Sequence, residues 1–205
     1  MRPSDKELRK RGILFLGDSF TEGFGLLPEQ SYPSLIEAKL GQNSPWQIIN
    51  GGISGDTTMD AFYRLAPLLK RHSNVEVLVV FLGANDLFNQ ISPEFAYSYF
   101  KKIIEEARST NSSMRIFVVE FPSIPGMGAK LATDFESIFP RLVKEMEIEL
   151  LPFFLQGVML QPEYCLADGV HPNAAGMEKV SVTVWNALFQ NSSNIIDPLS
   201  LAPES

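Results

Sequence analysis

Apolar residues are arranged along this chain in two alternating patterns. Short runs of consecutive apolar residues are typical of strands buried on both faces of a sheet. Longer stretches repeat an apolar residue every three or four positions, which is typical of a helix with one buried face. The runs predict strands at 13–16, 47–50, 75–82, 115–121 and 149–154, and the periodic stretches predict helices at 31–40, 58–71, 92–109, 133–147 and 173–189.

The ends of the predicted helices carry residues suited to those positions. Ser92-Pro93-Glu94 combines a capping side chain, a proline and a first-turn acid at the start of the third helix, and Asn173 caps the last one. His72 is expected to cap the C-terminal end of the second helix. Pro140 is expected to distort the fourth helix, because a proline inside a helix removes a hydrogen bond.

Strands and helices alternate from one end of the chain to the other. This alternation predicts a parallel sheet with right-handed crossovers and helices on both faces. Neither an internal repeat nor a linker interrupts the pattern. We therefore expect one three-layer α/β/α domain over residues 1–205, with a core at about 12–189 and peripheral segments at 1–11 and 190–205.

The overall charge and the rarity of metal-ligating residues exclude several classes of function. The chain has 205 residues and a formal net charge of −7, which disfavours nucleic acid as the main partner because phosphate binding needs a basic surface. Cys165 is the single cysteine, and His72 and His171 are the two histidines. These residues are too few for a zinc-type cluster, so we expect neither a metal ion nor another cofactor.

The sequence contains no stretch with the character of a membrane segment. Residues 1–12 are mostly polar, and the apolar run at 13–16 is too short for a signal peptide. No stretch approaches the ~20 apolar residues that span a bilayer. We expect no transmembrane segment, and a location in the cytoplasm or, if a signal peptide has been removed, in the periplasm.

Unusual polar residues follow the predicted strands. The carboxyl ends of parallel strands meet at one edge of a sheet, where such folds bind their ligands, so we expect these residues to converge. The segments that follow the strands are Gly17-Asp18-Ser19, 50–56, Gly83-Ala84-Asn85-Asp86 and, at some distance from the fifth strand, Asp168-Gly169-Val170-His171.

Three of these residues have the chemistry of a catalytic triad. A serine hydroxyl is a poor nucleophile at neutral pH and needs a base beside it. His171 stands three residues after Asp168, a spacing that lets the carboxylate face Nδ1 of the imidazole and leaves Nε2 for the hydroxyl of Ser19. The sequence predicts Ser19 as nucleophile, His171 as base and Asp168 as the acid that orients the base.

A reaction at Ser19 also needs donors for the oxyanion that develops on the substrate. The backbone N–H of Ser19 is one candidate, and the amide of Asn85 is another. A glycine of the Gly51-Gly52 pair is a third, because no Cβ separates its N–H from a ligand.

Four longer stretches resemble one family, the SGNH (GDSL) hydrolases. They are GDSFTEGFG, INGGISGDTT, FLGANDLF and ADGVHPNAAG, in the order and spacing of the subgroup of bacterial acyl-CoA thioesterase I, lysophospholipases and arylesterases. The resemblance covers 12 to about 189 and implies a flavodoxin-like sheet of five parallel strands in the order 2-1-3-4-5. It implies Ser19 as nucleophile, Gly52 and Asn85 as oxyanion donors, and Asp168 and His171 as the remaining triad members. Ala84 stands where many thioesterase-like members have glycine, which bears on the shape of the pocket.

Each candidate residue also has a purely structural interpretation. Ser19 alone could cap a helix, Asp168 could be a turn residue and His171 could begin a helix. The coincidence of all three at matching strand ends favours catalysis. Asp18 and Asp86 are interpreted as acids that bond backbone amides and brace the neighbouring loops.

The expected substrate is a small-molecule acyl ester or thioester with a lipid-like acyl group. Apolar side chains in the loops near the site either line an acyl groove or fold back onto the core. The groove residues are Leu87, Phe88, Ile124, Pro125 and Met127. Two other functions remain open, a carbohydrate O-acetyl esterase on the same scaffold and a binding protein without catalysis.

Overall fold

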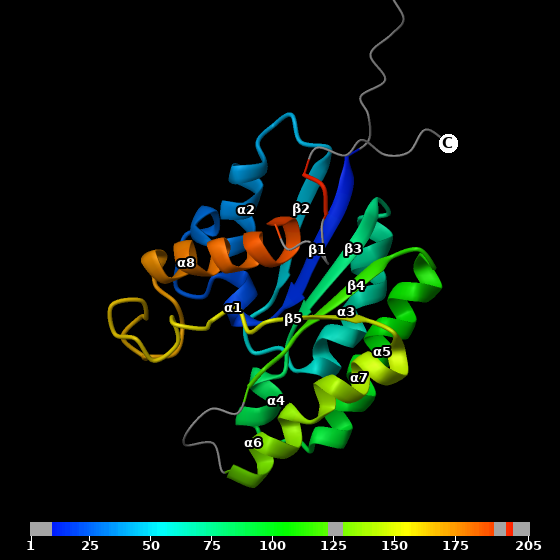
Figure 1. Ribbon diagram of the computed structural model, residues 1–205, viewed down its shortest axis with the longest axis vertical. Helices are drawn as coiled ribbons and strands as arrows, with labels where there is room; N and C mark the ends of the chain where they lie inside the picture. The colour runs from blue at the N-terminus through cyan, green and yellow to red at the C-terminus, as the bar shows by residue number, and fades with distance from the viewer. Residues whose placement is uncertain (1–9, 123–128, 191–195, 199–205) are drawn as a thin grey trace, which may run out of the picture.

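A five-stranded sheet forms the centre of the molecule (Figure 1). The structure is a computed structural model that describes residues 10–122, 129–190 and 196–198. The strand order is β2-β1-β3-β4-β5 and every neighbouring pair is parallel, which confirms the expected topology. The strands are β1 (Arg11–Gly17), β2 (Trp46–Gly52), β3 (Val75–Phe81), β4 (Arg115–Val119) and β5 (Glu149–Leu151).

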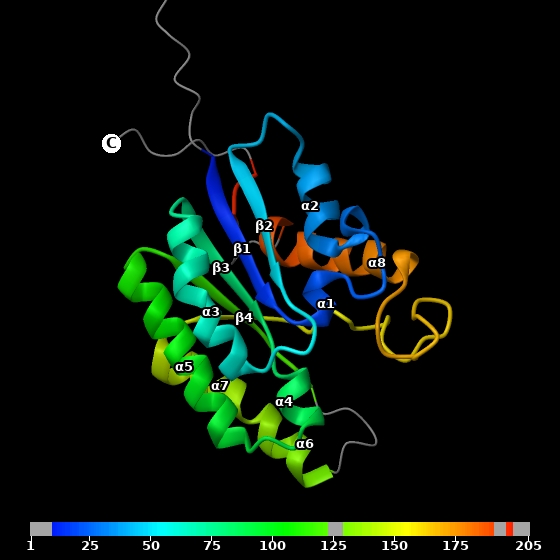
Figure 2. The same cartoon turned by 180° about the vertical axis from the view of Figure 1, so that it is seen from behind.

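Helices cover both faces of this sheet (Figures 1 and 2). On one face, α2 (Tyr32–Leu40) packs against α8 (Ala174–Trp185). On the other face, α5 (Pro93–Thr110) contacts both α3 (Thr58–Arg71) and α7 (Ile138–Met146). The result is the expected three-layer α/β/α arrangement.

The burial of the strands explains why their sequences are nearly continuous apolar runs. In β3, every residue except Glu76 is buried, and in β1 every residue after Arg11 is buried. A strand covered on both faces has no solvent side that would require polar residues. Edge-to-face ring contacts join the sheet to its surroundings, with centroid distances of 5.4 Å for Phe15–Tyr32 and 5.4 Å for Phe81–Phe154.

Capping side chains set the starts of the longer helices. Thr57 and Asp60 form a reciprocal capping box at the start of α3. The Ser92 side chain accepts a hydrogen bond from the Phe95 N–H, and Asn173 accepts one from the Gly176 N–H, as expected for these two caps.

The helix predicted at 133–147 is wrong, because the chain forms two helices there. They are α6 (Ala129–Glu136) and α7 (Ile138–Met146), and the break falls at Ser137 rather than at Pro140. The ring of a proline clashes with the carbonyl group four residues earlier. For Pro140 that carbonyl belongs to Glu136, the last residue of α6, so the helix ends one turn before the proline.

Two further boundaries differ from the sequence prediction. The fifth strand ends at Leu151, because Pro152 has no N–H to continue the ladder, and the buried Phe153 and Phe154 lie beyond the strand. The last α-helix ends at Trp185 and continues as a wider π-type turn over Asn186–Gln190.

Some predictions fall on residues outside the described ranges. Ile124, Pro125 and Met127 are among these, as are most of the peripheral segments predicted at the two ends. Within the described ranges, no helix is both long enough and apolar enough to cross a membrane.

Candidate active site

The register of the sheet brings three loops to one edge. Gly17 at the end of β1 pairs with Gly52 of β2 on one side and with Phe81 of β3 on the other. The segments that follow these strands carry Ser19, the loop at 53–56 and Asn85, so these residues start from aligned positions. The convergence of strand ends that the sequence predicted is confirmed for β1, β2 and β3.

Ser19 is the first residue of α1 (Ser19–Glu22), a single turn that begins two residues after the end of β1. Asp18 caps this turn, with its Oδ1 accepting a hydrogen bond of 3.0 Å from the Phe20 N–H. The Ser19 residue is only 8% exposed. In the described part of the chain, its own N–H has no hydrogen-bond partner, so this donor is unused within the protein.

The side chains of Ser19, His171 and Asp168 form a continuous hydrogen-bonded chain. Nε2 of His171 lies 2.9 Å from Oγ of Ser19, although the two residues are 152 positions apart. Nδ1 of the same ring lies 2.7 Å from Oδ2 of Asp168. With Nδ1 donating to the carboxylate, Nε2 is left as an acceptor for the serine proton.

The Asp168 carboxylate is stabilised in its ionised form. Burial alone raises the pKa of Asp168, but hydrogen bonds from the Val170 N–H, the His171 ring and the His171 N–H outweigh it and lower the pKa to about 2. The two backbone bonds are both 2.9 Å and end on Oδ1, which leaves Oδ2 for the ring. The acid is therefore charged whenever the site works at neutral pH.

Two phenylalanine rings flank the imidazole of His171. The Phe24 ring lies 4.5 Å from it and the Phe20 ring 5.4 Å, measured between centroids. Phe20 is buried, whereas Phe24 is 45% exposed. Both rings pack against the imidazole, and Phe24 is the one of the two that reaches solvent.

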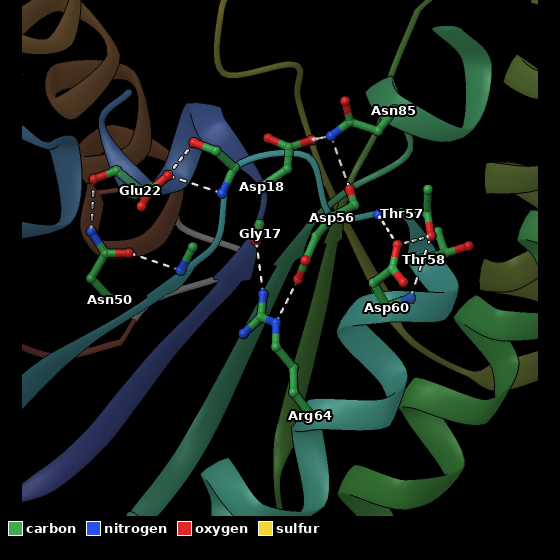
Figure 3. A network of polar contacts seen from close by, with 12 residues as sticks. Gly17, Asp18, Glu22, Asn50, Asp56, Thr57, Thr58, Asp60, Arg64 and Asn85 are labelled. Atoms are coloured by element: carbon green, nitrogen blue, oxygen red, sulfur yellow. Dashed lines mark hydrogen bonds and ion pairs between the residues drawn. The ribbon is translucent and has the colours of Figure 1, made fainter. Parts of the chain in front are cut away.

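The side-chain amide of Asn85 points toward Asp18, the residue before Ser19, and toward Asp56 (Figure 3). Asn85 lies in α4 (Ala84–Phe88), directly after β3. Its Nδ2 donates to the Asp56 carbonyl at 2.9 Å and lies 3.5 Å from Oδ2 of Asp18. A primary amide carries two N–H groups, and the one that a ligand could take over is the one bonded to Asp18 at 3.5 Å, the longer of the two hydrogen bonds.

Gly52 does not have the free N–H that the prediction required. Its N–H donates to Oδ1 of Asn50 at 2.9 Å, and Nδ2 of Asn50 donates to the Thr21 carbonyl. A Cβ at Gly52 would lie 2.1 Å from the Glu22 nitrogen. Gly52 therefore serves the close approach of β2 to α1, and its N–H is already bonded.

Gly55, three residues later, has the properties expected at Gly52. Its φ of 87° lies in the left-handed region, nothing would come within 4 Å of an added Cβ, and the residue is exposed. In the described part of the chain its N–H has no hydrogen-bond partner. The Glu22 carboxylate holds the preceding residue, Ser54, by its N–H and its hydroxyl (Figure 3).

Buried acids brace the loops of the site, as predicted for Asp18 and Asp86. Asp86 accepts hydrogen bonds from the N–H and the hydroxyl of Thr58, which ties α4 to the start of α3. Burial raises the pKa of Asp86 despite these bonds. Burial also raises the pKa of Asp18 to about 7, with further contributions from the charges of Asp56 and Asp86.

The apolar residues near the site divide between the two interpretations. Leu87 is 3% exposed and belongs to the core, so it folds back and does not line a groove. Phe88, its neighbour, is 50% exposed. A cavity of about 550 Å³ lies beside Phe24. Its lining residues are Glu22, Gly23, Phe24, Gly25, Leu26, Pro28, Ser34, Asn50 and Ser54.

The described residues offer little to a metal ion. Nowhere in the described ranges do three His, Cys, Asp or Glu side chains gather in a way that could hold one. Cys165 is buried and its Sγ lies 3.3 Å from the Val158 carbonyl, consistent with the structural role expected for it. His72 is the C-terminal cap of α3.

A search of protein-family models matches residues 15–179 to the GDSL-like Lipase/Acylhydrolase family. The chain belongs to this family. The match spans the described site from the end of β1 to α8, and confirms the resemblance found in the sequence motifs.

Characterised relatives of this GDSL-like chain cover most of its length. An arylesterase of Vibrio mimicus is 34% identical over 180 residues, which are 87% of this chain and 88% of the relative. The Thioesterase 1/protease 1/lysophospholipase L1 of Escherichia coli (strain K12) is 33% identical over 165 residues, 78% of this chain and 75% of the relative.

Solved structures of similar proteins share the fold. The crystal structure of TesA has a TM-score of 0.79 and 26% identity, and the match covers 87% of this chain and 98% of the other. AlinE4, an SGNH-hydrolase family esterase, has a TM-score of 0.71 and 35% identity, with 87% and 94% covered. These similarities agree with the strand order of the GDSL-like chain.

Three residues at the site escaped the sequence prediction. They are Gly55, Phe24 and Arg64. The dipeptide Gly55-Asp56 is a turn signal that marks a positive φ, so it offered a clue to Gly55. Nothing in the sequence indicates that the ring of Phe24 lies against His171.

Proposed function

We propose that this protein is a serine esterase that hydrolyses ester or thioester bonds of acyl substrates through an acyl-enzyme on Ser19. The observation that carries the proposal is the unbroken chain from Oγ of Ser19 through His171 to the Asp168 carboxylate, at 2.9 and 2.7 Å. An activated serine needs this base and this acid, in this order. The names of the relatives, an arylesterase and a thioesterase/lysophospholipase, support the reaction class.

The proposed reaction has two halves. Oγ of Ser19 attacks the acyl carbon while Nε2 of His171 takes its proton, and Asp168 stabilises the imidazolium. His171 then gives the proton to the departing alcohol or thiol. In the second half, His171 takes a proton from water, the resulting hydroxide attacks the acyl-enzyme, and His171 returns the proton to Ser19.

We assign the oxyanion donors to the Ser19 N–H, the Gly55 N–H and the Asn85 amide. The first two are without partners in the described part of the chain, and the third would exchange its long bond of 3.5 Å to Asp18 for one to the substrate. Gly55 replaces Gly52 in this assignment, because Asn50 already holds the Gly52 N–H. Donors fixed before the reaction are worth more than donors that must reorganise.

The cavity beside Phe24 is our candidate for the substrate side. Phe24, Leu26 and Pro28 supply apolar surface to it, and Asn50 and Ser54 supply polar groups. Mostly apolar cavities with a few polar groups are typical of small-molecule sites. We propose that the substrate is a small acyl ester or thioester.

Replacing the nucleophile tests the proposed function. Ser19→Ala should lower kcat on p-nitrophenyl butyrate by several orders of magnitude with the fold intact, and should abolish labelling by a fluorophosphonate probe. Hydrolysis by the Ser19→Ala protein at the rate of the unmodified protein would refute this nucleophile. A series of acyl esters, acyl-CoAs and acetylated sugars then identifies the substrate class, and activity confined to acetylated sugars would replace the lipid-like assignment.

A further inference from the structure

We propose that Arg64 is a positioning residue that fixes the oxyanion donors relative to the nucleophile; the inference rests on the proposed function. Arg64 lies in α3 and has no hydrogen bond to Ser19, His171 or Asp168 among the described contacts. Its role is carried by two other contacts of its guanidinium.

The guanidinium of Arg64 joins the end of β1 to the loop that follows β2 (Figure 3). Its Nε donates to Oδ2 of Asp56 at 2.5 Å, and its Nη2 donates to the Gly17 carbonyl at 3.0 Å. Gly17 ends β1, two residues before Ser19, whereas Asp56 directly follows Gly55. One cation therefore sets the distance between the nucleophile turn and the loop of a proposed oxyanion donor.

Asp56 also connects Arg64 to Asn85, the second proposed oxyanion donor outside the nucleophile turn. The Asp56 carboxylate is held by Arg64, and the Asp56 carbonyl accepts the hydrogen bond from Nδ2 of Asn85. Both contacts belong to one residue, so a displacement of Asp56 moves Asn85 as well as Gly55. Errors of about 1 Å in such a site lower rates by about a hundredfold.

The charges around Asp56 make this contact hard to replace. The side chains of Arg64 and Asp56 are 21% and 12% exposed. Burial raises the pKa of Asp56, and the hydrogen bond and charge of Arg64 oppose that rise. Without Arg64, a largely buried carboxylate would face the acids at Asp60 and Glu22 without its partner, and would take up a proton or move.

A planar guanidinium suits this double contact better than an ammonium group. Arg64 reaches a carboxylate with one nitrogen and a carbonyl with another, in a fixed geometry. The Gly17 carbonyl also accepts a hydrogen bond of 3.1 Å from the Ile53 N–H, so Arg64 completes an existing link between β1 and the next loop. We therefore expect lysine to rescue the charge but not the geometry.

Steady-state kinetics of Arg64→Gln and Arg64→Lys test the inference. Both variants should lower kcat on p-nitrophenyl butyrate by about 10- to 100-fold, Arg64→Lys less than Arg64→Gln, and leave KM within about threefold. Arg71→Gln, which removes an exposed arginine from the end of the same helix, is the matched control and should leave both constants unchanged. A rise in KM with unchanged kcat would overturn the inference.

A double-mutant cycle separates positioning from a general loss of stability. If Arg64 acts through the donor loops, Arg64→Gln should cost less than about threefold when Asn85→Ala is already present. An equal loss in both backgrounds would overturn the inference. If circular dichroism shows that Arg64→Gln is unfolded, Asp56→Asn takes its place in the same cycle. A smaller loss in the Asn85→Ala background again supports the inference, and an equal loss overturns it. A wild-type protein without ester hydrolysis would refute the proposed function instead.

Discussion

The proposed acid–base half of the site and its proposed oxyanion half are built in different ways. Asp168 and His171 meet within four consecutive residues, and the carboxylate accepts bonds from the backbone of the same turn. The oxyanion half depends on three strand ends. Its contacts join residues that are 29 positions apart for Asn85 and Asp56, and 47 apart for Arg64 and Gly17.

The pKa values of the acids in the two halves are shifted in opposite directions. In the acid–base half, local hydrogen bonds lower the pKa of Asp168 to about 2, so the charge is stable without help from the rest of the fold. In the oxyanion half, burial raises the pKa of Asp18 to about 7 and also raises that of Asp86. The acid–base half is held by hydrogen bonds within one turn of the chain, whereas the oxyanion half depends on contacts between several loops at the edge of the sheet. Substitutions in each half should therefore have different signatures.

The largest effect is expected from Asp168→Asn in the acid–base half. The amide has the shape of the carboxylate but cannot hold the imidazole in the correct tautomer, so kcat should fall by about 10⁴-fold. Stopped-flow or steady-state hydrolysis of p-nitrophenyl butyrate measures the loss. Because the turn at 168–171 is local, the melting temperature should change little.

A small loss of kcat in the Asp168→Asn protein would contradict this assignment of roles. Glu163→Gln is a suitable control, since Glu163 lies a few residues upstream in the same segment and its side chain is exposed. It should leave both kcat and the melting temperature unchanged.

Asn85→Ala in the oxyanion half should have the next largest effect. Removal of one oxyanion donor typically costs about 10²- to 10³-fold in kcat. It also leaves the Asp56 carbonyl without its donor, so the free energy of unfolding should fall by about 1 kcal/mol, unlike the local half. Kinetics and urea unfolding on the same sample measure both changes. An unchanged kcat would remove Asn85 from the site.

The contact between Asp168 and His171 was predictable because it follows from a spacing of three residues. The layers follow from the alternating patterns, whereas the strand order was implied by the family motifs. The contact of His171 with Ser19 was expected because polar segments that follow the strands converge at one edge of a parallel sheet. These are short-range or topological properties, which a sequence expresses directly.

The oxyanion half was only partly predictable, because a backbone N–H can serve a substrate only if no side chain of the protein already accepts its hydrogen bond. The sequence does not show which of these N–H groups are already bonded. Gly52 has the right residue type, but Asn50 takes its N–H. Arg64 and Asp56 are eight residues apart, whereas side chains that meet on a helix are three or four residues apart, so their contact could not be predicted from helical spacing. The helix break was predicted at Pro140 but lies at Ser137, because the ring of a proline clashes with the carbonyl group one turn earlier.

Asp18→Asn tests the different electrostatics of the two halves. An acid whose folded pKa is raised favours the folded state at low pH, and this contribution is lost as pH rises from its unfolded pKa of about 4 through about 7. The amide keeps Oδ1 as acceptor for the Phe20 N–H and removes the charge. Relative to wild type, the variant should therefore gain a few kcal/mol on going from pH 5 to pH 8, measured by urea unfolding.

Asp60→Asn is the control for this pH dependence. Hydrogen bonds from Thr57 lower the pKa of Asp60, so this acid is ionised at both pH values and its replacement should cost the same at each. If Asp18→Asn changes the free energy of unfolding by the same amount at pH 5 and pH 8, the pKa of Asp18 is not raised in the folded protein and its charge does not destabilise the oxyanion half.

The smallest expected effect distinguishes the two glycines of the loop after β2. Gly55→Ala places a side chain in open space but at a φ of 87°, which costs about 1 kcal/mol and shifts the loop, so kcat should fall about tenfold with little change in melting temperature. Gly52→Ala should show the reverse, because its Cβ would lie 2.1 Å from the Glu22 nitrogen and would force α1 away from β2, which lowers the melting temperature. If Gly55→Ala keeps the full kcat, the third donor lies elsewhere. The oxyanion half would then depend on Ser19 and Asn85 alone.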